Sequence, residues 1–371
     1  MDFDFPDELK QLRAEARRFL ADRCPPAAAR RALEGAAPDR ALWSELAAMG
    51  WIGAALPEQH GGAGLGHLAL CVLSEELGRS LAPLPWSSSV CLAAEAVVAF
   101  GSAEQRARRL PKLAAGEAIG TVALAAAPGP FDPARMVGAV VAGRITATRV
   151  AVPDAAAADF LVIAAPGPGS LLWLVERDAA GLTVSETAAI DPARPLGRVA
   201  LVDTPAEPLP GADTPDALRR LIDRAAVLAA FEQLGCAEAA LEMAAAYARE
   251  RYAFGRPIGS FQAIKHKLAD VYIAIELARA NAYYGAWALE TDSAELPVAA
   301  AVARIAACEA GWIATKENIQ THGGMGFTWA FDCHLYYRRA RAQALALGSA
   351  REWKHRLIDT LAARNAPARG D

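Results

Sequence analysis

The stretch RYAFGRPIGSFQAIKHKLAD, Arg251 to Asp270, separates two long alanine-rich segments whose apolar residues repeat at helical spacing. Gly255 and Pro257 predict that the first helix stops here, because glycine and proline end helices. Ser260 is expected to cap the N-terminus of the second helix through its hydroxyl. The stretch is therefore predicted to form a tight corner between two helices of a bundle.

Three side chains of this corner exceed what a turn needs. Arg251 supplies a forked cation that suits a phosphate or pyrophosphate, Phe254 supplies a flat apolar surface, and Gln262 supplies an amide that both donates and accepts. The spacing alone fits a structural turn equally well. The side-chain chemistry adds a second hypothesis, in which the corner holds a nucleotide.

A second candidate site lies in QTHGGMGFTWAFDCHLYYRRA, Gln320 to Ala340, where a predicted helix ends in adjacent glycines. Gly323, Gly324 and Gly326 would allow backbone amides to approach a ligand closely. A plain helix C-cap explains these glycines equally well when the stretch is taken alone. The presence of the first corner favours a ligand site.

The chain around these two corners is helical in pattern from residue 210 to residue 371. Apolar residues recur at i, i+3, i+4 and i+7, which is the spacing of a stripe that faces a bundle. The predicted helices are Leu218 to about Arg251, Phe261 to about Thr291, Leu296 to about Thr321, and Ala340 to Ala363. We therefore predict a C-terminal four-helix bundle over residues 210–371.

The pattern upstream of the bundle is different. Residues 119–209 contain short β-type runs between glycine, proline and aspartate turns, which predicts an antiparallel β-domain. Residues 1–118 again have helical periodicity. The breaks between their helices fall at prolines and glycines: Pro25-Pro26, Gly61–Gly66, Pro83 and Pro85. The predicted fold class is therefore α+β and multidomain: an all-α N-terminal domain, a middle antiparallel β-domain and the four-helix bundle.

Length and composition exclude several classes of protein. The 371 residues are 54% hydrophobic, enough for a large core, and positive and negative side chains are interspersed around a net charge of −4, so no nucleic-acid partner is expected. The six cysteines are far apart and have no metal-ligand spacing, which predicts reduced thiols of a cytoplasmic protein. The N-terminal MDFDFPDELKQLR is unlike a signal peptide, and no run is expected to reach the ~18 to 20 apolar residues of a membrane helix.

The two corners, in this order and at this spacing, resemble the acyl-CoA dehydrogenase family. The motifs are RxxFGxPIxxFQxxKHxLAD followed by QxHGGxGFT, and WSELAAMGWIGAALPEQHGGAG from Trp43 onward is similar to the family as well. The α, β, α order agrees, so the resemblance covers nearly the whole chain. It implies an FAD cofactor, a homotetramer or related assembly, and α,β-desaturation of an acyl-CoA thioester with hydride transfer to the flavin.

The resemblance also assigns cofactor-binding residues. In the family, the arginine, phenylalanine and glutamine of the first motif bind the ADP half of an FAD whose flavin lies in the neighbouring subunit. The glutamine and glycines of the second motif contribute to the same site. The matching residues in this chain are Arg251, Phe254, Gln262, Gln320, Gly323 and Gly324. All six are present, so the resemblance implies that this chain can hold the pyrophosphate of FAD.

The catalytic base of the family is absent from both of its usual positions. Desaturation needs a proton acceptor, and the commonest one is a glutamate before a Gly-Thr/Ser pair, where this chain has Leu347. A minority of the family places the base on the first bundle helix, where this chain has Ala225. Glu232, two helical turns further on, is the remaining candidate for a displaced base, although an ordinary helix carboxylate is the favoured interpretation.

The β-domain departs from the family as well. Family members usually hold the flavin ring with a Thr-Glu-Pro, Gly-Ser-Asp stretch and a Trp-Ile-Thr-Asn-type segment. This chain has LAAAPGPFD at Leu124–Asp132 and AVPDAAAAD at Ala151–Asp159, so the hydroxyls and the aromatic are missing, and Pro153 has no N–H to donate. The residues that would reach a partner's FAD remain, while those that would hold this chain's own flavin ring are lost.

This one-sided loss resembles the base-lacking subunits of heteromeric α2β2 acyl-CoA dehydrogenases, often from bacterial sterol side-chain degradation. The first hypothesis is therefore a flavoprotein subunit of lipid metabolism that completes the FAD site of a catalytic partner. Two alternatives remain open. One is a self-sufficient homomeric acyl-CoA dehydrogenase with a displaced base such as Glu232, and the other is a non-catalytic scaffold that binds acyl-CoA.

Overall fold

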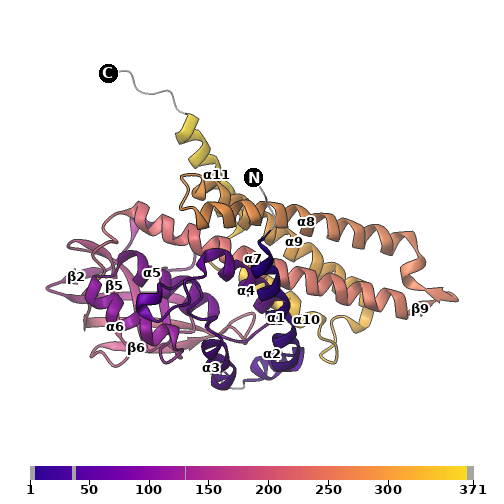
Figure 1. The fold of residues 1–371 in the computed structure, drawn as a ribbon, viewed down its shortest axis with the longest axis horizontal. Coiled ribbons are helices and arrows are strands. Elements are labelled where there is room, and N and C mark those ends of the chain that lie inside the picture. The colour runs from indigo at the N-terminus through magenta and orange to yellow at the C-terminus, as the bar shows by residue number, and fades with distance from the viewer. Residues whose placement is uncertain (1–4, 36–38, 130, 366–371) are drawn as a thin grey trace. The chain divides into compact units, whose positions relative to one another are not determined.

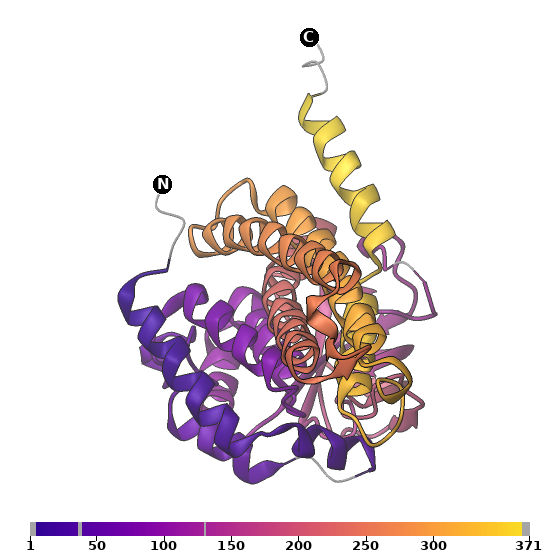
Figure 2. The same cartoon turned by 90° about the vertical axis from the view of Figure 1, so that its right-hand side faces the viewer.

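The computed structural model describes residues 5–35, 39–129 and 131–365 (Figures 1 and 2). The chain divides into two compact units. The first, the helical unit, consists of Met1–Pro26, Cys71–Ala82 and Ala226–Asp371. The second, the mixed unit, consists of Ala27–Leu70 and Pro83–Ala225.

Helices α4 (Gly66–Arg79) and α7 (Pro215–Glu250) contribute residues to both units. Along the chain, N-terminal helices are followed by β-sheets and then by a helical bundle, so the predicted α, β, α order is confirmed. The domain boundaries at residues 118 and 209 stay a prediction.

The helical unit is built from long helices, as the periodicity predicts. Its members are α1 (Asp7–Arg23), the second part of α4, most of α7, α8 (Gln262–Glu290), α9 (Leu296–His322), α10 (Cys333–Leu345) and α11 (Ala350–Asn365). α8 and α9 lie side by side, and α10 and α11 both pack on α9. α11 runs outward from this bundle in both views (Figures 1 and 2).

The fourth predicted helix, Ala340 to Ala363, is wrong, because the structure has two helices there and the first begins at Cys333. Leu347 and Gly348 lie between them with φ values of +60° and +99°. A residue in this left-handed region cannot continue an α-helix. The next residue, Ser349, forms a capping box: its hydroxyl accepts from the Glu352 N–H, and the Glu352 carboxylate accepts from the Ser349 N–H.

The corner after α7 is a β-hairpin rather than a plain turn between helices. β9 (Tyr252–Ala253) pairs antiparallel with β10 (Arg256–Pro257). Phe254 and Gly255, which connect them, have φ values of +52° and +78°. Positive φ at both central residues is the geometry of a two-residue type I′ turn. The hairpin therefore extends beyond the ends of α7 and α8 (Figure 1).

The predicted cap of α8 is also wrong. The Ser260 hydroxyl donates to the Pro257 carbonyl at 2.7 Å, inside the 3₁₀ turn η4 (Ile258–Ser260), and the N-cap position belongs to Phe261. The hairpin shifts the start of α8 by one residue relative to the pattern. Because a short 3₁₀ turn leads into the helix, the serine hydroxyl is used before the helix begins.

Two glycines allow α4 and α7 to touch through their backbones. A Cβ atom at Gly78 would lie 1.9 Å from the Glu232 carbonyl oxygen, and one at Gly235 would lie 1.8 Å from the Glu75 carbonyl oxygen. Real Cβ atoms cannot approach an oxygen so closely, so this crossing requires glycine on both helices.

Ion pairs surround the glycine crossing. They are Arg13–Glu75 (2.9 Å), Arg279–Glu75, Arg79–Glu238 (3.0 Å) and Arg17–Glu76 (2.8 Å). Only 2% of the Glu75 side chain and none of the Glu76 side chain is exposed. Burial raises the pKa of Glu76, although its hydrogen bond and ion pair with Arg17 oppose the shift. The network connects α1, α7 and α8 to α4.

The mixed unit contains the shorter helices. They are α2 (Pro26–Leu33), α3 (Arg40–Ala48), η1 (Glu58–His60), the first parts of α4 and α7, the π-helix η2 (Trp86–Ala94), α5 (Glu95–Phe100), α6 (Ala103–Ala114) and η3 (Pro133–Arg135). The π-helix continues directly into α5. Such wide helical turns are rare and often mark functional sites.

Two four-stranded sheets complete the mixed unit. In spatial order, the first holds β1 (Gly120–Ala123), β4 (Phe160–Gly167), β5 (Ser170–Glu176) and β8 (Glu207–Pro208). The second holds β2 (Ala139–Val141), β3 (Arg144–Pro153), β7 (Leu196–Pro205) and β6 (Leu182–Thr187). The predicted antiparallel arrangement is confirmed except for β1 and β4, which are parallel. The chain passes through the second sheet between these two strands, a crossover long enough for parallel pairing.

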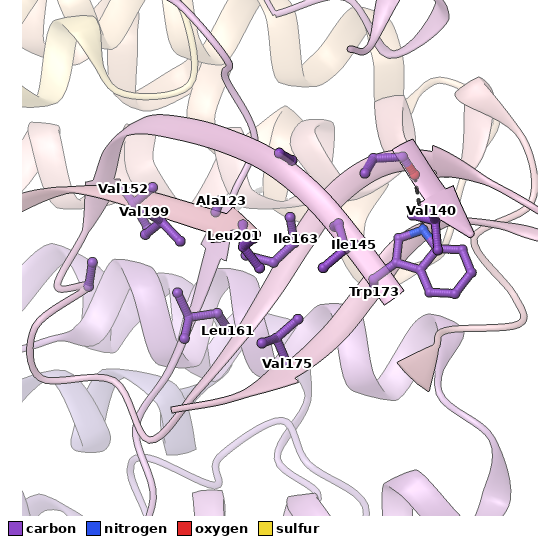
Figure 3. Close-up of a cluster of buried hydrophobic side chains, with 13 residues drawn as sticks. Ala123, Val140, Ile145, Val152, Leu161, Ile163, Trp173, Val175, Val199 and Leu201 are labelled. Atoms are coloured by element: carbon purple, nitrogen blue, oxygen red, sulfur yellow. Dashed lines mark hydrogen bonds between the residues drawn. The ribbon is translucent and has the colours of Figure 1, made fainter. Parts of the chain in front are cut away.

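The core of the mixed unit lies between the two sheets (Figure 3). Ile163 and Val175 from the first sheet and Ile145 and Leu201 from the second are buried in one hydrophobic cluster. Trp173 joins the cluster and donates its indole N–H to the Ala165 carbonyl at 3.0 Å, so its polar atom is satisfied. The sheets therefore pack face to face as a sandwich.

Helix α9 corrects one expectation from the sequence. By length and composition, the segment Leu296–Met325 is apolar enough to cross a membrane, although no such run was expected. However, 56% of its most apolar window is buried inside the structure, because α8, α10 and α11 cover it. This burial is that of a core helix. All six cysteines are buried and none forms a disulfide, as expected.

We expect Gly235→Ala to destabilise the protein by about 2 kcal/mol or more, because overpacking a backbone contact forces the helices apart. Chemical unfolding followed by circular dichroism measures the change. Gly324→Ala is the matched control: a Cβ atom there would meet nothing within 4 Å, so stability should change by less than about 0.5 kcal/mol. Equal stability of the two variants would show that the crossing tolerates a methyl group.

Candidate functional site

The two predicted corners lie at the same end of the helical bundle. The Tyr247 ring, in the last turn of α7, stacks on the His322 ring at the end of α9 with centroids 4.1 Å apart. Phe331, from the loop after α9, meets both rings at 6.5 Å and 5.9 Å. The structure thus brings together the two motifs that are far apart in the sequence.

The hairpin presents its functional side chains to solvent. The Phe254 side chain is 95% exposed, and its φ of +52° is unusual for a bulky residue. Arg251 and Gln262 are also exposed. The Arg251 backbone is held by Tyr247 at 2.8 Å and by Ile258 at 2.7 Å, while its guanidinium has no ion pair with the residues that the structure describes. A strained backbone that exposes an aromatic ring and a cation is suited to a ligand or partner.

The glycine loop after α9 is open in the same way. Gly324 has an ordinary backbone conformation, and a Cβ atom on it would meet no atom within 4 Å, so the chain itself does not require glycine there. Gly323 has a φ of +61°, and Gln320 is exposed. Gly326 differs, because a Cβ atom would lie 2.4 Å from the Ile319 carbonyl oxygen. Gly326 is needed for packing, whereas Gly324 leaves room for something outside the chain.

These residues fit the ADP half of FAD by their chemistry. A pyrophosphate needs a cation and backbone N–H groups, and an adenine needs a flat apolar surface and a two-way amide. The hairpin and the glycine loop offer all of these on one end of the bundle. The aromatic side chains Phe327 and Trp329, which follow the glycine loop along the chain, are 73% and 50% exposed.

Leu347 occupies a rigid corner. Its carbonyl accepts from the Trp353 indole N–H at 3.1 Å. Arg304, fully buried in α9, donates to the carbonyls of Gln343 and, at 2.9 Å, Ala346, which end α10. The corner is therefore well ordered, but it carries a side chain that cannot accept a proton.

The other two candidate positions are enclosed. Ala225 is 1% exposed and offers only a methyl group. Glu232 is 2% exposed, and its backbone lies against Gly78 of α4 at the glycine crossing. This position agrees with an ordinary buried carboxylate.

The two β-domain segments that depart from the family each form hydrogen bonds with neighbouring residues of the mixed unit. The Val150 N–H donates to the Ala125 carbonyl at 2.8 Å, and the Thr121 hydroxyl donates to the Pro153 carbonyl at 2.5 Å. The Asp154 carboxylate accepts from the Ser88 hydroxyl at 2.5 Å. Several polar groups along these segments are thus already satisfied within the mixed unit.

Sequence reasoning missed a buried charged cluster in the mixed unit. The His67 Nε2 atom lies 3.0 Å from Glu95 Oε1, and the Arg224 Nε and Nη2 atoms lie 2.9 Å and 2.8 Å from Glu95 Oε2. Burial alone would raise the pKa of Glu95, but hydrogen bonds and positive charge from His67 and Arg224 lower it to about 2. No motif marks these residues, which come from three separate helices.

Comparison with known proteins gives consistent matches over the chain. The family model described as "Acyl-CoA dehydrogenase, N-terminal domain" matches residues 6–117, and "Acyl-CoA dehydrogenase, C-terminal domain" matches residues 216–357. "Acyl-CoA dehydrogenase IpdE2" of Mycobacterium tuberculosis is 37% identical over 358 residues, 95% of this chain and 96% of that protein.

Solved structures agree with these matches. A chain of the "Tcur3481-Tcur3483 steroid ACAD G363A variant" has a TM-score of 0.89 and 37% identity, covering 97% of this chain and 99% of that one. A chain of the ChsE4-ChsE5 complex from Mycobacterium tuberculosis has a TM-score of 0.90 and 30% identity, covering 99% and 100%.

We expect Glu95→Gln to flatten the acid dependence of stability. The pKa of Glu95 lies near 2 in the folded protein and at 4.5 in its ordinary state, so the ionised carboxylate stabilises the fold above pH 4.5. This contribution, roughly 3 kcal/mol, is lost as the pH falls toward 2. Urea unfolding between pH 5 and about pH 3 measures it. The exposed Glu186→Gln control should keep the wild-type slope, and parallel slopes for both variants would contradict the assignment.

Proposed function

Because this chain belongs to the acyl-CoA dehydrogenase family of FAD-dependent oxidoreductases, we propose that it is one subunit of a heteromeric member and completes an FAD site seated mainly in a catalytic partner. One observation carries the proposal. The residues that fit the ADP half of FAD are exposed to solvent. The two usual positions of the base carry Leu347 and Ala225, and polar groups of the segments that would hold a flavin ring form hydrogen bonds within the mixed unit.

In the proposed site, this chain binds and orients the cofactor. Arg251 would donate to the pyrophosphate, the backbone N–H groups of Gly323 and Gly324 would approach it, and Phe254, Gln262 and Gln320 would hold the adenosine end. FAD would supply the acceptor for the hydride of the acyl β-carbon. The hairpin strain at Phe254 supports this role, because a strained exposed aromatic is retained where it contacts a ligand.

The proton of the α-carbon goes to the partner in this proposal. Leu347 and Ala225 cannot accept it, and Glu232 is enclosed at the glycine crossing. A glutamate of the partner subunit would therefore act as the base. Both solved structures reported above are named as pairs of different chains, which supports a heteromeric assembly here as well.

We extend the proposal to the acyl group. One similar structure is described as a steroid acyl-CoA dehydrogenase, so a ring-bearing acyl-CoA thioester is the substrate class that we propose for the assembly. The test compares the rates at which ring-bearing and straight-chain acyl-CoA thioesters bleach the flavin absorbance of the assembly. Faster bleaching by straight-chain thioesters would exclude it.

Flavin stoichiometry tests the shared site. We expect the chain expressed alone to purify with far less than one FAD per chain, and the complex with its partner to hold one FAD per pair of chains. Absorbance of released flavin against protein concentration measures both values. One FAD on every isolated chain, with turnover of acyl-CoA, would refute the shared-site proposal.

Arg251→Met in the complex should weaken FAD binding roughly tenfold to a hundredfold, because one charge-assisted contact to a phosphate is lost. Flavin fluorescence during dilution measures the dissociation constant. Arg249→Gln is the matched control, since Arg249 is an exposed arginine in the last turn of α7. An equal effect of both substitutions would assign the loss to surface charge rather than to the site.

Leu347→Glu separates the shared site from a self-sufficient enzyme. A base supplied at a complete site adds about 10²- to 10⁴-fold to the rate. We expect no gain in the chain alone, because it lacks the groups that hold a flavin ring. Acyl-CoA-dependent bleaching after FAD addition is the measurement, with Leu345→Glu, 60% exposed, as the control for an added carboxylate. A gain specific to Leu347→Glu would show that this chain holds its own flavin.

A further inference from the structure

The His67, Glu95 and Arg224 cluster connects three helices of the mixed unit. His67 is in the first turn of α4, Glu95 is the first residue of α5 directly after the π-helix, and Arg224 lies on α7. Their side chains are 19%, 4% and 15% exposed. At this burial, solvent screens the charges only weakly, so the proton on His67 matters for the contacts around it.

Two contacts of the same His67 nitrogen require opposite states of that atom. Nε2 lies 3.0 Å from Glu95 Oε1, and an ionised carboxylate only accepts hydrogen bonds. Nε2 also lies 2.8 Å from Arg224 Nη2, and a guanidinium only donates. A ring nitrogen cannot donate to the first and accept from the second at the same time. The contact with Glu95 therefore needs a proton on Nε2, as in the protonated ring or the neutral Nε2–H tautomer, and the contact with Arg224 needs Nε2 without a proton.

We propose that His67 is a pH-sensitive switch between α5 and α7. In the neutral ring the proton sits on Nδ1, and Nε2 accepts from Arg224. In the protonated ring, Nε2–H donates to Glu95, and the Arg224 Nη2 atom loses its acceptor on the ring. Protonation thus breaks the hydrogen bond that joins the first turn of α4 to α7 and forms one that joins it to α5.

The two charges beside the ring act in opposite directions on a proton at Nε2. The Arg224 cation disfavours a second positive charge on His67, whereas the Glu95 carboxylate favours it. Since the pKa of Glu95 is lowered to about 2, Glu95 stays ionised while His67 titrates. The Arg224 guanidinium keeps two contacts to Glu95 Oε2 in either state, so only the hydrogen bonds of His67 change. This inference does not depend on the proposed flavin site.

Nitrogen NMR of the full chain labelled with ¹⁵N-histidine tests the switch. The chain has six histidines, and His67→Gln assigns the signal. Above the midpoint of the titration, we expect an unprotonated Nε2 and a protonated Nδ1; below it, both nitrogens are protonated. A neutral ring with its proton on Nε2, or a ring that keeps one state from pH 5 to about pH 9, would overturn the proposal.

Arg224→Met provides a second and sharper test. Without the guanidinium, the neutral ring should move its proton to Nε2 and donate to Glu95, and its proton affinity should rise about tenfold or more. Glu95→Gln should lower the proton affinity by a similar factor. Arg219→Gln, on the same helix but paired with Asp216 at 2.6 Å, is the control and should leave the His67 titration unchanged. An unchanged tautomer in Arg224→Met would overturn the proposal.

Hydrogen exchange distinguishes a switch from a histidine that merely titrates. After correction for intrinsic rates, peptides that cover the first turn of α4 should change protection at the same midpoint as the His67 signal. His67→Gln should remove this pH dependence. If the ring titrates as expected but exchange in α4 is independent of pH, the cluster is a static ion pair and the switch is refuted.

Discussion

The contact of two helix backbones at Gly78 and Gly235 is the constraint on which the helical unit depends. α4 and α7 lie close together because no side chains separate them at these glycines. Arg13 of α1 and Arg279 of α8 both form ion pairs with Glu75 of α4. A buried carboxylate destabilises the fold unless it is paired with a cation. The close approach of the two helices therefore depends on the arginines that pair with the buried glutamates. The hairpin and the glycine loop stand at the end of the bundle that this contact organises.

Much of the fold could be predicted from periodicity and from glycine and proline positions. The long helices and the β-rich middle follow from patterns of 3.6 and 2 residues, which burial imposes directly. The break at Leu347 could not be predicted, because leucine favours helix and nothing local shows a positive φ. The displaced role of Ser260 was hidden by a hairpin of two-residue strands, which is too short to produce a pattern. The parallel pairing of β1 and β4 depends on a crossover through a second sheet.

The candidate site was predictable only where it is a local motif. Arg251 and Phe254 are only three residues apart in the sequence, so their proximity can be predicted without knowing the fold. The cluster at Glu95 has the opposite character: His67 is 28 residues away and Arg224 is 129 residues away along the chain. Such long-range contacts appear only when the helices are placed in three dimensions.

Arg304 carries a buried positive charge that uncharged amide and carbonyl oxygens, rather than a carboxylate, accommodate in the described part of the chain. Its partners are the amide oxygen of Gln233 and two carbonyls at the negative end of α10. None of these groups titrates in the range of carboxylates and histidines. The hydrogen bonds of Arg304 therefore do not depend on pH, whereas the ion pair between Arg17 and Glu76 is lost when the Glu76 carboxyl group is protonated, so the helical unit contains one contact that responds to acid and one that does not.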